Sequence, residues 1–457
     1  MNNSNLFNNK LNFKKMKKNY FAIAAFAATA LFASCDKDND RKNPDNPGKA
    51  TSMKVLLTFP NGHQTRATLD PNATDTEAAV LDVDVFIYYT SSGNFASHAH
   101  LPASAFTANG SNSGADVYEY TATTKVSTTT GAKTVFAGIN LPSSVVNALK
   151  NQPINALSTV AQIMSREDLT TNGFAMFSVQ GVNSTFVENE NDPANKVTLR
   201  CQRLVAKVTV ETSPTLDVAG VPGTLDNLNF AIFNFNTKLF MLQGAAEERR
   251  DPNWSLLSYV PGDFIDLDDR YAPILRRVTG VTPDIKTDYT PLYAAENTSE
   301  GKRKKEITRA LVRATFIPES VTVGTTGNFT VNSAHGVTTP QTFYAVTPSV
   351  TEGTSYFFTQ SIANAFAAEK GGTVLEYTNG LCYWDIFLNK QPLNDQNRWD
   401  VLRNDFYRCN ITRIVAPGRN TPDVPDPEET PDVDTSITTS IEILFWHTPP
   451  VSDYVLD

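Results

Sequence analysis

Hydrophobic and polar residues alternate along most of this chain, and sustained helical spacing is scarce. Strict alternation over several residues is the pattern of a β-strand with one buried face. A helix is predicted at 143–149 and a helical or irregular stretch at 157–169. Strands are predicted at 51–60, 81–89, 117–124, 133–140, 195–211, 228–235, 307–316, 342–346, 355–359, 373–377, 381–388 and 406–414. The pattern therefore predicts an all-β protein.

Turn residues divide the predicted strands into two groups. Residues 213–224 are punctuated by Pro and Gly, so we place a domain boundary at their start. The sequence thus predicts two β-sandwich domains in tandem, an N-terminal one at 67–212 and a C-terminal one at 213–415. Residues 244–300 form a long insertion of low regularity within the second domain.

Two strands near the ends of the chain stand apart from these domains. The first has one apolar row, formed by Met53, Val55, Leu57 and Phe59. The last lies in the segment 435–457, where one face is formed by Ile437, Thr439, Ile441, Ile443 and Phe445, with Trp446 on the other face. The linker at 416–434 is rich in Pro and acidic residues, so we expect it to be extended and unpacked. We therefore expect this last strand to join a sheet of another copy of the chain.

A polar stretch around Arg66 separates the first strand from the predicted sandwich domain. An exposed arginine in such a stretch is a natural protease site, and cleavage between Arg66 and Ala67 would remove the tether and strand at 36–66. The sheet edge left open would be a template for strand addition. The donor segment of a neighbouring copy is expected to fill it, and repetition of this head-to-tail contact gives a filament.

Composition and charge add a location and exclude one class of partner. The formal net charge of −9 argues against nucleic acid, and the 27 Phe and 15 Tyr favour strands. Residues 1–35 are a targeting segment, because lysines precede an apolar run that is too short to span a bilayer. Cys35 follows small residues at the end of this segment, so we expect it to be lipidated in the precursor. An ordinary signal peptide with a chance cysteine is the alternative.

Residues that could carry catalysis or bind a metal are sparse. No catalytic, phosphate-binding or zinc-protease motif appears, so we predict neither an enzyme nor a cofactor nor a metal. His98 and His100 have a metal-compatible spacing if they share one face of a strand, but a surface loop is the simpler interpretation. The basic run 302–305 is expected to be a solvated loop, with a polyanion contact as the alternative.

Cysteine usage leaves two interpretations open. If 381–389 and 405–414 paired as a hairpin, Cys382 would fall opposite Cys409, and a disulfide could form. Buried thiols are the other interpretation.

Several stretches resemble the shaft subunits of Bacteroidia-type (type V) fimbriae, in the fimbrillin family, and most closely the stalk subunit of minor fimbriae. The matching stretches are FASC (32–35), TRA (65–67), RLVAKVTV (203–210), ALVRATF (310–316), LRNDFY (402–407), IEILFW (441–446) and YVLD (454–457). The resemblance implies two transthyretin-like sandwich domains and a lipoprotein precursor at the outer membrane. It also implies trimming by an Arg-specific extracellular protease, and then polymerisation through a donor strand into a cell-surface fimbrium that supports adhesion.

The resemblance assigns roles by position and names partners. Arg66 and Ala67 would be the scissile pair, residues 53–59 the removed strand and residues 437–446 the donor strand. The implied partners are other copies of the chain, accessory fimbrial subunits and the protease. The chain departs from an uninterrupted donor strand at Pro449 and Pro450, which are expected to stop ladder pairing.

Two other roles are compatible with the same sequence. One is a tip or anchor subunit of the same kind of fimbria. The other is a monomeric surface lipoprotein that binds glycan or host protein.

Overall fold

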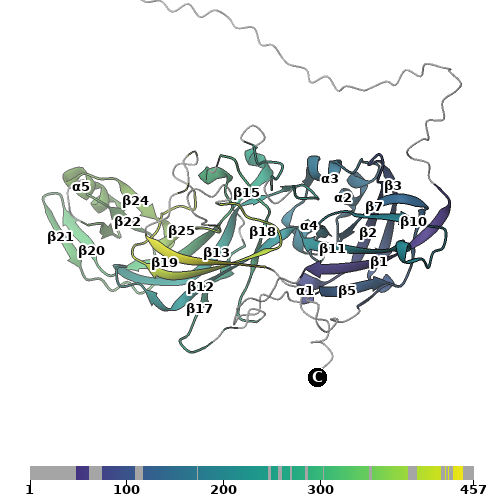
Figure 1. Ribbon diagram of the computed structural model, residues 1–457. Coiled ribbons are helices and arrows are strands. Elements are labelled where there is room, and N and C mark those ends of the chain that lie inside the picture. The colour runs from purple at the N-terminus through teal and green to yellow at the C-terminus, as the bar shows by residue number, and fades with distance from the viewer. Residues whose placement is uncertain are drawn as a thin grey trace, which may run out of the picture. The chain divides into compact units, whose positions relative to one another are not determined.

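The structure is a computed structural model, and Figure 1 shows its ribbon. It describes residues 48–60, 75–108, 117–171, 173–244, 249–255, 260–267, 270–281, 283, 287–301, 303–348, 353–389, 399–423, 428, 431 and 436–445. Cys35, the predicted cleavage pair Arg66 and Ala67, and Trp446 lie outside these residues. Within them most secondary structure is strand, which confirms the predicted all-β fold class.

The N-terminal part of the chain forms a 10-stranded sheet in the order β3-β2-β7-β9-β11-β1-β5-β4, with β10 beside β7 and β6 beside β1. Its strands are β1 (Ala50–Pro60), β2 (Asp82–Tyr89), β3 (Phe95–Pro102), β4 (Phe106–Ala108), β5 (Val117–Ala122), β6 (Val126–Thr129), β7 (Gly131–Ile139), β9 (Met176–Ser178), β10 (Val182–Phe186) and β11 (Lys196–Arg203). Short helices connect them: α1 (Asp75–Ala78), α2 (Ser143–Leu149), α3 (Ala156–Thr159), α4 (Arg166–Thr170) and the 3₁₀ turns η1 (Ala103–Ala105) and η2 (Pro193–Asn195).

The C-terminal part forms two 5-stranded sheets. One follows β17-β12-β26-β27 with β18 beside β12, and the other follows β15-β13-β19-β25 with β16 beside β13. Their strands are β12 (Val205–Asp217), β13 (Gly223–Asn236), β15 (Phe264–Leu267), β16 (Ala272–Pro273), β17 (Leu275–Arg276), β18 (Leu292–Ala295), β19 (Arg309–Pro318), β25 (Leu381–Phe387), β26 (Asp405–Ile414) and β27 (Ile437–Phe445). Buried side chains from both sheets belong to one hydrophobic cluster, so the sheets pack face to face as a sandwich.

Smaller elements complete this part of the chain. A hairpin, a three-stranded sheet and the helix α5 pack together around a separate small cluster that includes Ala363 and Phe366 of the helix. These elements are β20 (Val321–Thr325), β21 (Asn328–Ser333), β22 (Phe343–Val346), β23 (Ser355–Phe357), β24 (Val374–Tyr377) and α5 (Gln360–Lys370). The remaining ones are the pair β8 (Gln162–Ile163) and β14 (Lys238–Leu239), and the 3₁₀ turns η3 (Pro261–Asp263), η4 (Lys304–Glu306) and η5 (Thr378–Gly380).

The predicted strands are largely present, and the helix predicted at 143–149 is α2. The expected boundary between residues 212 and 213 lies inside β12, because the change from the first sheet to the second occurs at Leu204. Residues 44–457 form one unit, since buried side chains of the 10-stranded sheet and of the sandwich belong to the same cluster. In the described part of the chain, no helix is long and apolar enough to cross a membrane.

Candidate functional site

The strand predicted to be removed, β1, is an interior strand of the first sheet (Figure 1). It pairs in parallel with β11 and antiparallel with both β5 and β6. Its predicted apolar row is fully buried, with exposed fractions of 0% for Met53, Val55 and Leu57 and 2% for Phe59. Since β1 supplies backbone partners on both sides as well as this row, its departure would open a groove in the sheet.

A buried amide holds the N-terminal half of β1. Asn195, which is 1% exposed, donates from Nδ2 to Thr51 Oγ1 at 3.1 Å and to the Ser52 carbonyl at 2.9 Å. The Thr51 hydroxyl in turn donates to the Val187 carbonyl at 2.7 Å, and the Val187 N–H donates to Asn195 Oδ1 at 2.9 Å. Asn195 is not recognisable from the sequence, because an asparagine after Pro193 and before a strand is an ordinary turn residue.

The chain just after the predicted cleavage pair is anchored by a buried ion pair. Glu77 of α1 is 1% exposed, and its carboxylate lies 3.0 Å from Nζ of Lys207, which is fully buried in β12. The Tyr293 hydroxyl donates to the same carboxylate at 2.6 Å, and Arg203 Nε donates to the Glu77 carbonyl at 2.9 Å. Residues 75–78 are therefore held independently of β1.

The predicted donor strand is present as β27, but it already has a partner in its own chain. It pairs antiparallel with β26, from Ile437 opposite Ile414 to Phe445 opposite Asp405. A strand without a partner in its own chain was expected; β27 instead satisfies the outer backbone groups of β26, as an exposed sheet edge favours.

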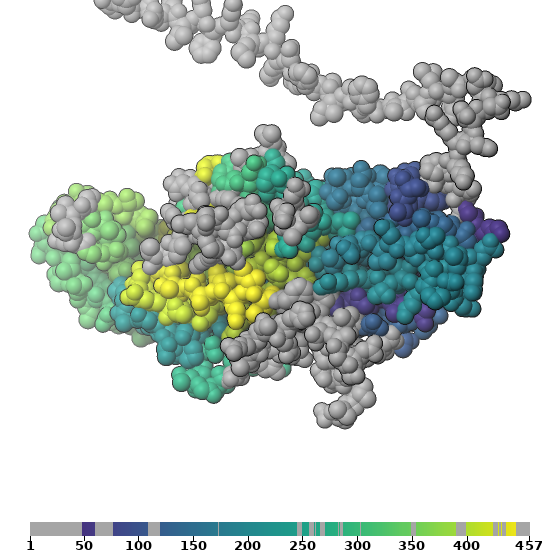
Figure 2. Space-filling model, viewed as in Figure 1, coloured from purple at the N-terminus to yellow at the C-terminus, as the bar shows by residue number. Residues whose placement is uncertain are grey.

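β27 pairs with a neighbouring strand on one side only. It is the last strand of its sheet, and part of the yellow C-terminal surface in Figure 2. Of the predicted inward side chains at 437–443, Ile437 is buried, at 4% exposed, Thr439 and Ile441 are half-buried, and Ile443 is 37% exposed. Nη1 of Arg408 lies 3.3 Å from the exposed Glu442 carboxylate. The strand is thus less buried here than β1 is in the first sheet.

The start of the linker is packed, which corrects the expectation that 416–434 is unpacked throughout. Arg419 exchanges backbone hydrogen bonds with Tyr383 of β25, and its guanidinium lies 2.5 Å from the Asp385 carboxylate. The Tyr377 hydroxyl donates to the Gly418 carbonyl at 2.9 Å. The buried Asp385 on β25 and Arg419, the fourth residue of the linker, thus form an ion pair. The Pro- and acid-rich composition of the linker gives no indication of this contact.

The charge of Asp385 is expected to stabilise the start of the linker through its ion pair with Arg419. Burial would raise the pKa of this carboxyl, but the nearby Arg309 and Arg419 outweigh it and hold the pKa below the usual 3.8. The associated stability is therefore fully present above that value and is lost as the pH falls below it. Asp385→Asn should destabilise the fold by about 1–3 kcal/mol at neutral pH, should reduce the acid-side loss, and should speed trypsin cleavage after Arg419.

Urea unfolding as a function of pH and timed trypsin digestion measure these effects. Asp217 provides the control, because its pair with Arg413 is about half exposed on both sides. Asp217→Asn should leave both readouts near those of the parent. Equal digestion of the Asp385 and Asp217 variants after Arg419 would contradict the role given to Asp385.

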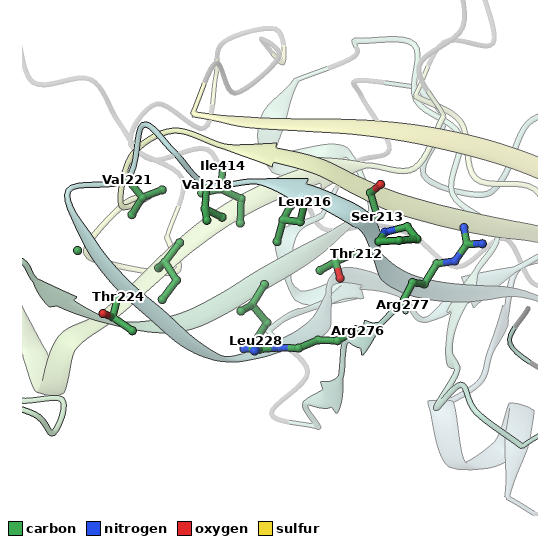
Figure 3. Close-up of a pocket in the computed structure, with 13 residues that line it drawn as sticks. Thr212, Ser213, Leu216, Val218, Val221, Thr224, Leu228, Arg276, Arg277 and Ile414 are labelled. Carbon is green, nitrogen blue, oxygen red and sulfur yellow. The ribbon is translucent and has the colours of Figure 1, made fainter. Parts of the chain in front are cut away.

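A surface hollow of about 420 Å³ lies beside the start of β27. Figure 3 shows side chains from the end of β12, the following turn, the start of β13 and Ile414 of β26 around it. The lining is mainly aliphatic, including Leu216, Val218 and Val221, and two arginines, Arg276 and Arg277, stand on one side.

The other candidate groups of the sequence have structural partners. His98 and His100 lie on one face of a strand, β3, so the surface-loop interpretation is wrong. Nε2 of His98 and Nδ1 of His100 lie 2.7 and 3.2 Å from Oδ1 of Asp84. Among the described residues, no group of three or more His, Cys, Asp or Glu is arranged to hold a metal ion. In the basic run, Arg303 and Lys305 pair with Glu428 of the linker.

The hairpin that would have joined Cys382 to Cys409 does not form. Cys382 lies on β25 beside β19, and Cys409 lies on β26 between β12 and β27, so the two strands belong to different sheets. Cys201, Cys382 and Cys409 are buried and form no disulfide with one another. The interpretation as buried thiols is the correct one.

One family model matches the C-terminal region of the chain. It is described as the C-terminal part of fimbrillin, major fimbrial subunit protein type IV, and it matches residues 375–449. The matched region includes β25, β26, the linker and β27. No curated relative matches the sequence.

The search of solved structures returned proteins of Bacteroides and Porphyromonas, all of low sequence identity. A candidate cell adhesion protein of Bacteroides eggerthii is 14% identical, with 89% of this chain and 98% of that one covered and a TM-score of 0.47. A fimbrilin of Porphyromonas gingivalis is 10% identical, with 87% and 98% covered and a TM-score of 0.46. A tip fimbrial protein of the same species, truncated at its C-terminus, is 14% identical, with 86% and 100% covered and a TM-score of 0.39. Similarity at this level assigns no function; what the comparisons show is that the C-terminal region of the chain, residues 375–449, matches the fimbrillin family of fimbrial subunits.

Proposed function

We propose that this chain is the main shaft subunit of a cell-surface fimbria, and that it polymerises head to tail by donor-strand exchange. The precursor is lipidated at Cys35 and reaches the outer membrane. An Arg-specific extracellular protease cuts between Arg66 and Ala67, β1 leaves, and β27 of the next copy takes its place. The product supports adhesion, in company with accessory fimbrial subunits.

The observation that supports this proposal most directly is the position of β1. It is an interior strand, with neighbours on both sides and four fully buried side chains. At about 1.5–3 kcal/mol for each side chain, the gross burial is on the order of 10 kcal/mol. An empty groove would expose this apolar surface and unpaired backbone groups, so it is unstable. Binding of a replacement strand after trimming is therefore strongly favoured.

Exchange of the donor strand into a neighbouring copy is expected to be favourable. In its own chain β27 pairs only with β26, and Ile443 remains 37% exposed. In the place of β1 it would have neighbours on both sides and would bury the whole apolar row. The exchange therefore increases both backbone pairing and buried apolar area, although ordering the linker opposes part of that gain.

A second role is supported by the pairing of β27 with its own β26. A tip or anchor subunit, or a monomeric adhesin that binds glycan or host protein, has no need to donate this strand. In such a protein β27 would simply complete the edge of its sheet.

Trypsin treatment of the purified precursor distinguishes these roles. We expect loss of the segment before Ala67 and the appearance of oligomers that resist SDS, because a buried interior strand dissociates slowly. Arg66→Ala should leave a monomer after the same treatment. A chain without 435–457 should be trimmed but should not polymerise, while circular dichroism shows its fold retained. Oligomers formed by that shortened chain would contradict donor-strand exchange.

A further inference from the structure

The donor strand repeats the sequence of the strand that it would replace. Residues 51–58 read TSMKVLLT, and residues 439–446 read TSIEILFW. Both begin with Thr-Ser, place one charged residue between two aliphatic ones, and carry leucine at the sixth position. The likeness extends over the first seven of these positions, on both faces of the strand.

We propose that this repeat sets the register of exchange: Thr439 takes the place of Thr51, and Asn195 of the accepting copy is the residue that selects it. The inference rests on the proposed function and deepens it, because it names which donor residue meets which acceptor residue. Ile441, Ile443 and Phe445 then follow the places of Met53, Val55 and Leu57.

Asn195 selects a threonine at one position of the incoming strand. Its buried amide donates to a threonine hydroxyl and to the next carbonyl, and that hydroxyl donates to the Val187 carbonyl. A strand with an apolar side chain at this point would leave the buried amide and carbonyl with fewer partners, which is costly. Thr439 restores the hydroxyl, and its neighbour Ser440 supplies the carbonyl.

The same register removes a like-charge contact. Lys54 of β1 is exposed and lies opposite the exposed Lys196 of β11 in the parallel pair. Like charges directly opposite each other on neighbouring strands are destabilising, whereas opposite charges are favourable. The shared register puts Glu442 in the place of Lys54, so the donor strand faces Lys196 with the complementary charge.

The prolines after the donor strand also fit this alignment. The ladder of β1 ends at Pro60, which lies opposite Val117. Thr448 takes that place, so Pro449 is the first residue beyond the ladder and its missing N–H breaks no pairing. The donor strand therefore extends to about residue 448 in the groove.

A shift by four residues is the chief competitor, because Thr435-Ser436 is a second Thr-Ser pair. That register would put Thr439 in the place of Val55, which is 0% exposed, and Ser440 in the place of Leu56, which is 5% exposed. It would also put Glu442 in the place of Thr58, which is 8% exposed. Burying these three polar groups is unfavourable, and the first register places only one polar residue, His447, at a buried apolar position, that of Phe59, so the first register is preferred.

Crosslinking between copies reads the register directly. In full-length chains trimmed by trypsin, Lys196→Cys combined with Glu442→Cys should give disulfide-linked oligomers under mild oxidation, since directly opposite strand residues lie within disulfide range. Lys196→Cys combined with Thr438→Cys is the matched control, and it should crosslink only in the shifted register. In its own chain, position 442 faces Arg408 of β26 and not β11.

The hydroxyl contact is tested separately. Thr439→Val should speed dissociation of trimmed oligomers on the order of tenfold, because one buried hydrogen-bonding site loses its partners. Thr438→Val, at an exposed position, should change it by less than about twofold. Unchanged dissociation for the Thr439 variant would overturn the role of Asn195.

The possible failures are distinguishable from one another. Crosslinks through position 438 instead of 442 would overturn the register and leave strand exchange standing. SDS-resistant oligomers that crosslink at neither position would show that β27 does not lie beside β11, which overturns the register too. Absence of oligomers from the trimmed parent chain would overturn the proposed function and this inference together.

Discussion

Leu57→Ala is expected to destabilise the uncut precursor by about 2–5 kcal/mol while leaving the assembled filament unchanged. Leu57 is fully buried in β1, so its truncation creates a cavity in the first sheet. Under the proposed donor-strand exchange the filament would contain no β1, because the strand would leave with the segment before Ala67. Urea unfolding of the precursor and SDS resistance of the trimmed oligomers measure the two states separately.

Leu199 provides the matched control for this experiment. It lies directly opposite Leu57 on β11 and is equally buried, but it stays in the chain after trimming. Leu199→Ala should therefore weaken the precursor and the filament alike. If Leu57→Ala weakened the filament as much as Leu199→Ala does, β1 would still be present in the assembled subunits.

Glu77→Ala is expected to cost about 3–5 kcal/mol of folding stability in both the precursor and the trimmed chain. The substitution removes the carboxylate that faces Lys207, whose ammonium is fully buried, and leaves that charge without its acid. The Tyr293 hydroxyl loses its acceptor as well. Thermal or urea unfolding of both forms gives the size of the effect.

Glu167 shows the expected contrast, because its pair with Arg270 is more than half exposed on both sides. Glu167→Ala should cost less than about 1 kcal/mol. The double variant Glu77→Leu with Lys207→Met should recover part of the loss, since it removes the buried Lys207 ammonium together with its acid, while the buried Arg203 guanidinium remains. A Glu77→Ala chain as stable as the Glu167→Ala chain would refute the anchoring role.

The strand pattern was readable from the sequence because a half-buried strand imposes a period of two. It placed β1 and β27 to within about two residues and identified Met53, Val55, Leu57 and Phe59 as one buried row. It did not reveal α5, which lies between two predicted strands and buries few side chains, among them Ala363 and Phe366. A helix that covers a small sheet with one narrow face has little periodic signal.

Which strands pair with each other could not be predicted from the sequence. The pairing of β27 with β26 of the same chain depends on which sheet edge is free to accept a strand. The residue pattern within β27 does not predict which edge that is. The separation of Cys382 and Cys409 into different sheets has the same cause, because neighbouring strands in the sequence need not be neighbours in a sandwich. The contact between Arg419 and Asp385 likewise links a linker to a strand through folding alone.

The parallel pairing of β1 with β11 has a consequence for the timing of assembly. Val55 of β1 pairs with Val197 of β11, so β1 is synthesised long before its partner strand. The place of β1 in the sheet therefore stays open until late in folding. A tethered strand competes at an effective concentration of about millimolar, well above that of a second molecule. The proposed cut after Arg66 would convert β1 from an intramolecular strand into a separate peptide that dilutes away. Mass action would then favour the donor strand of a neighbouring copy.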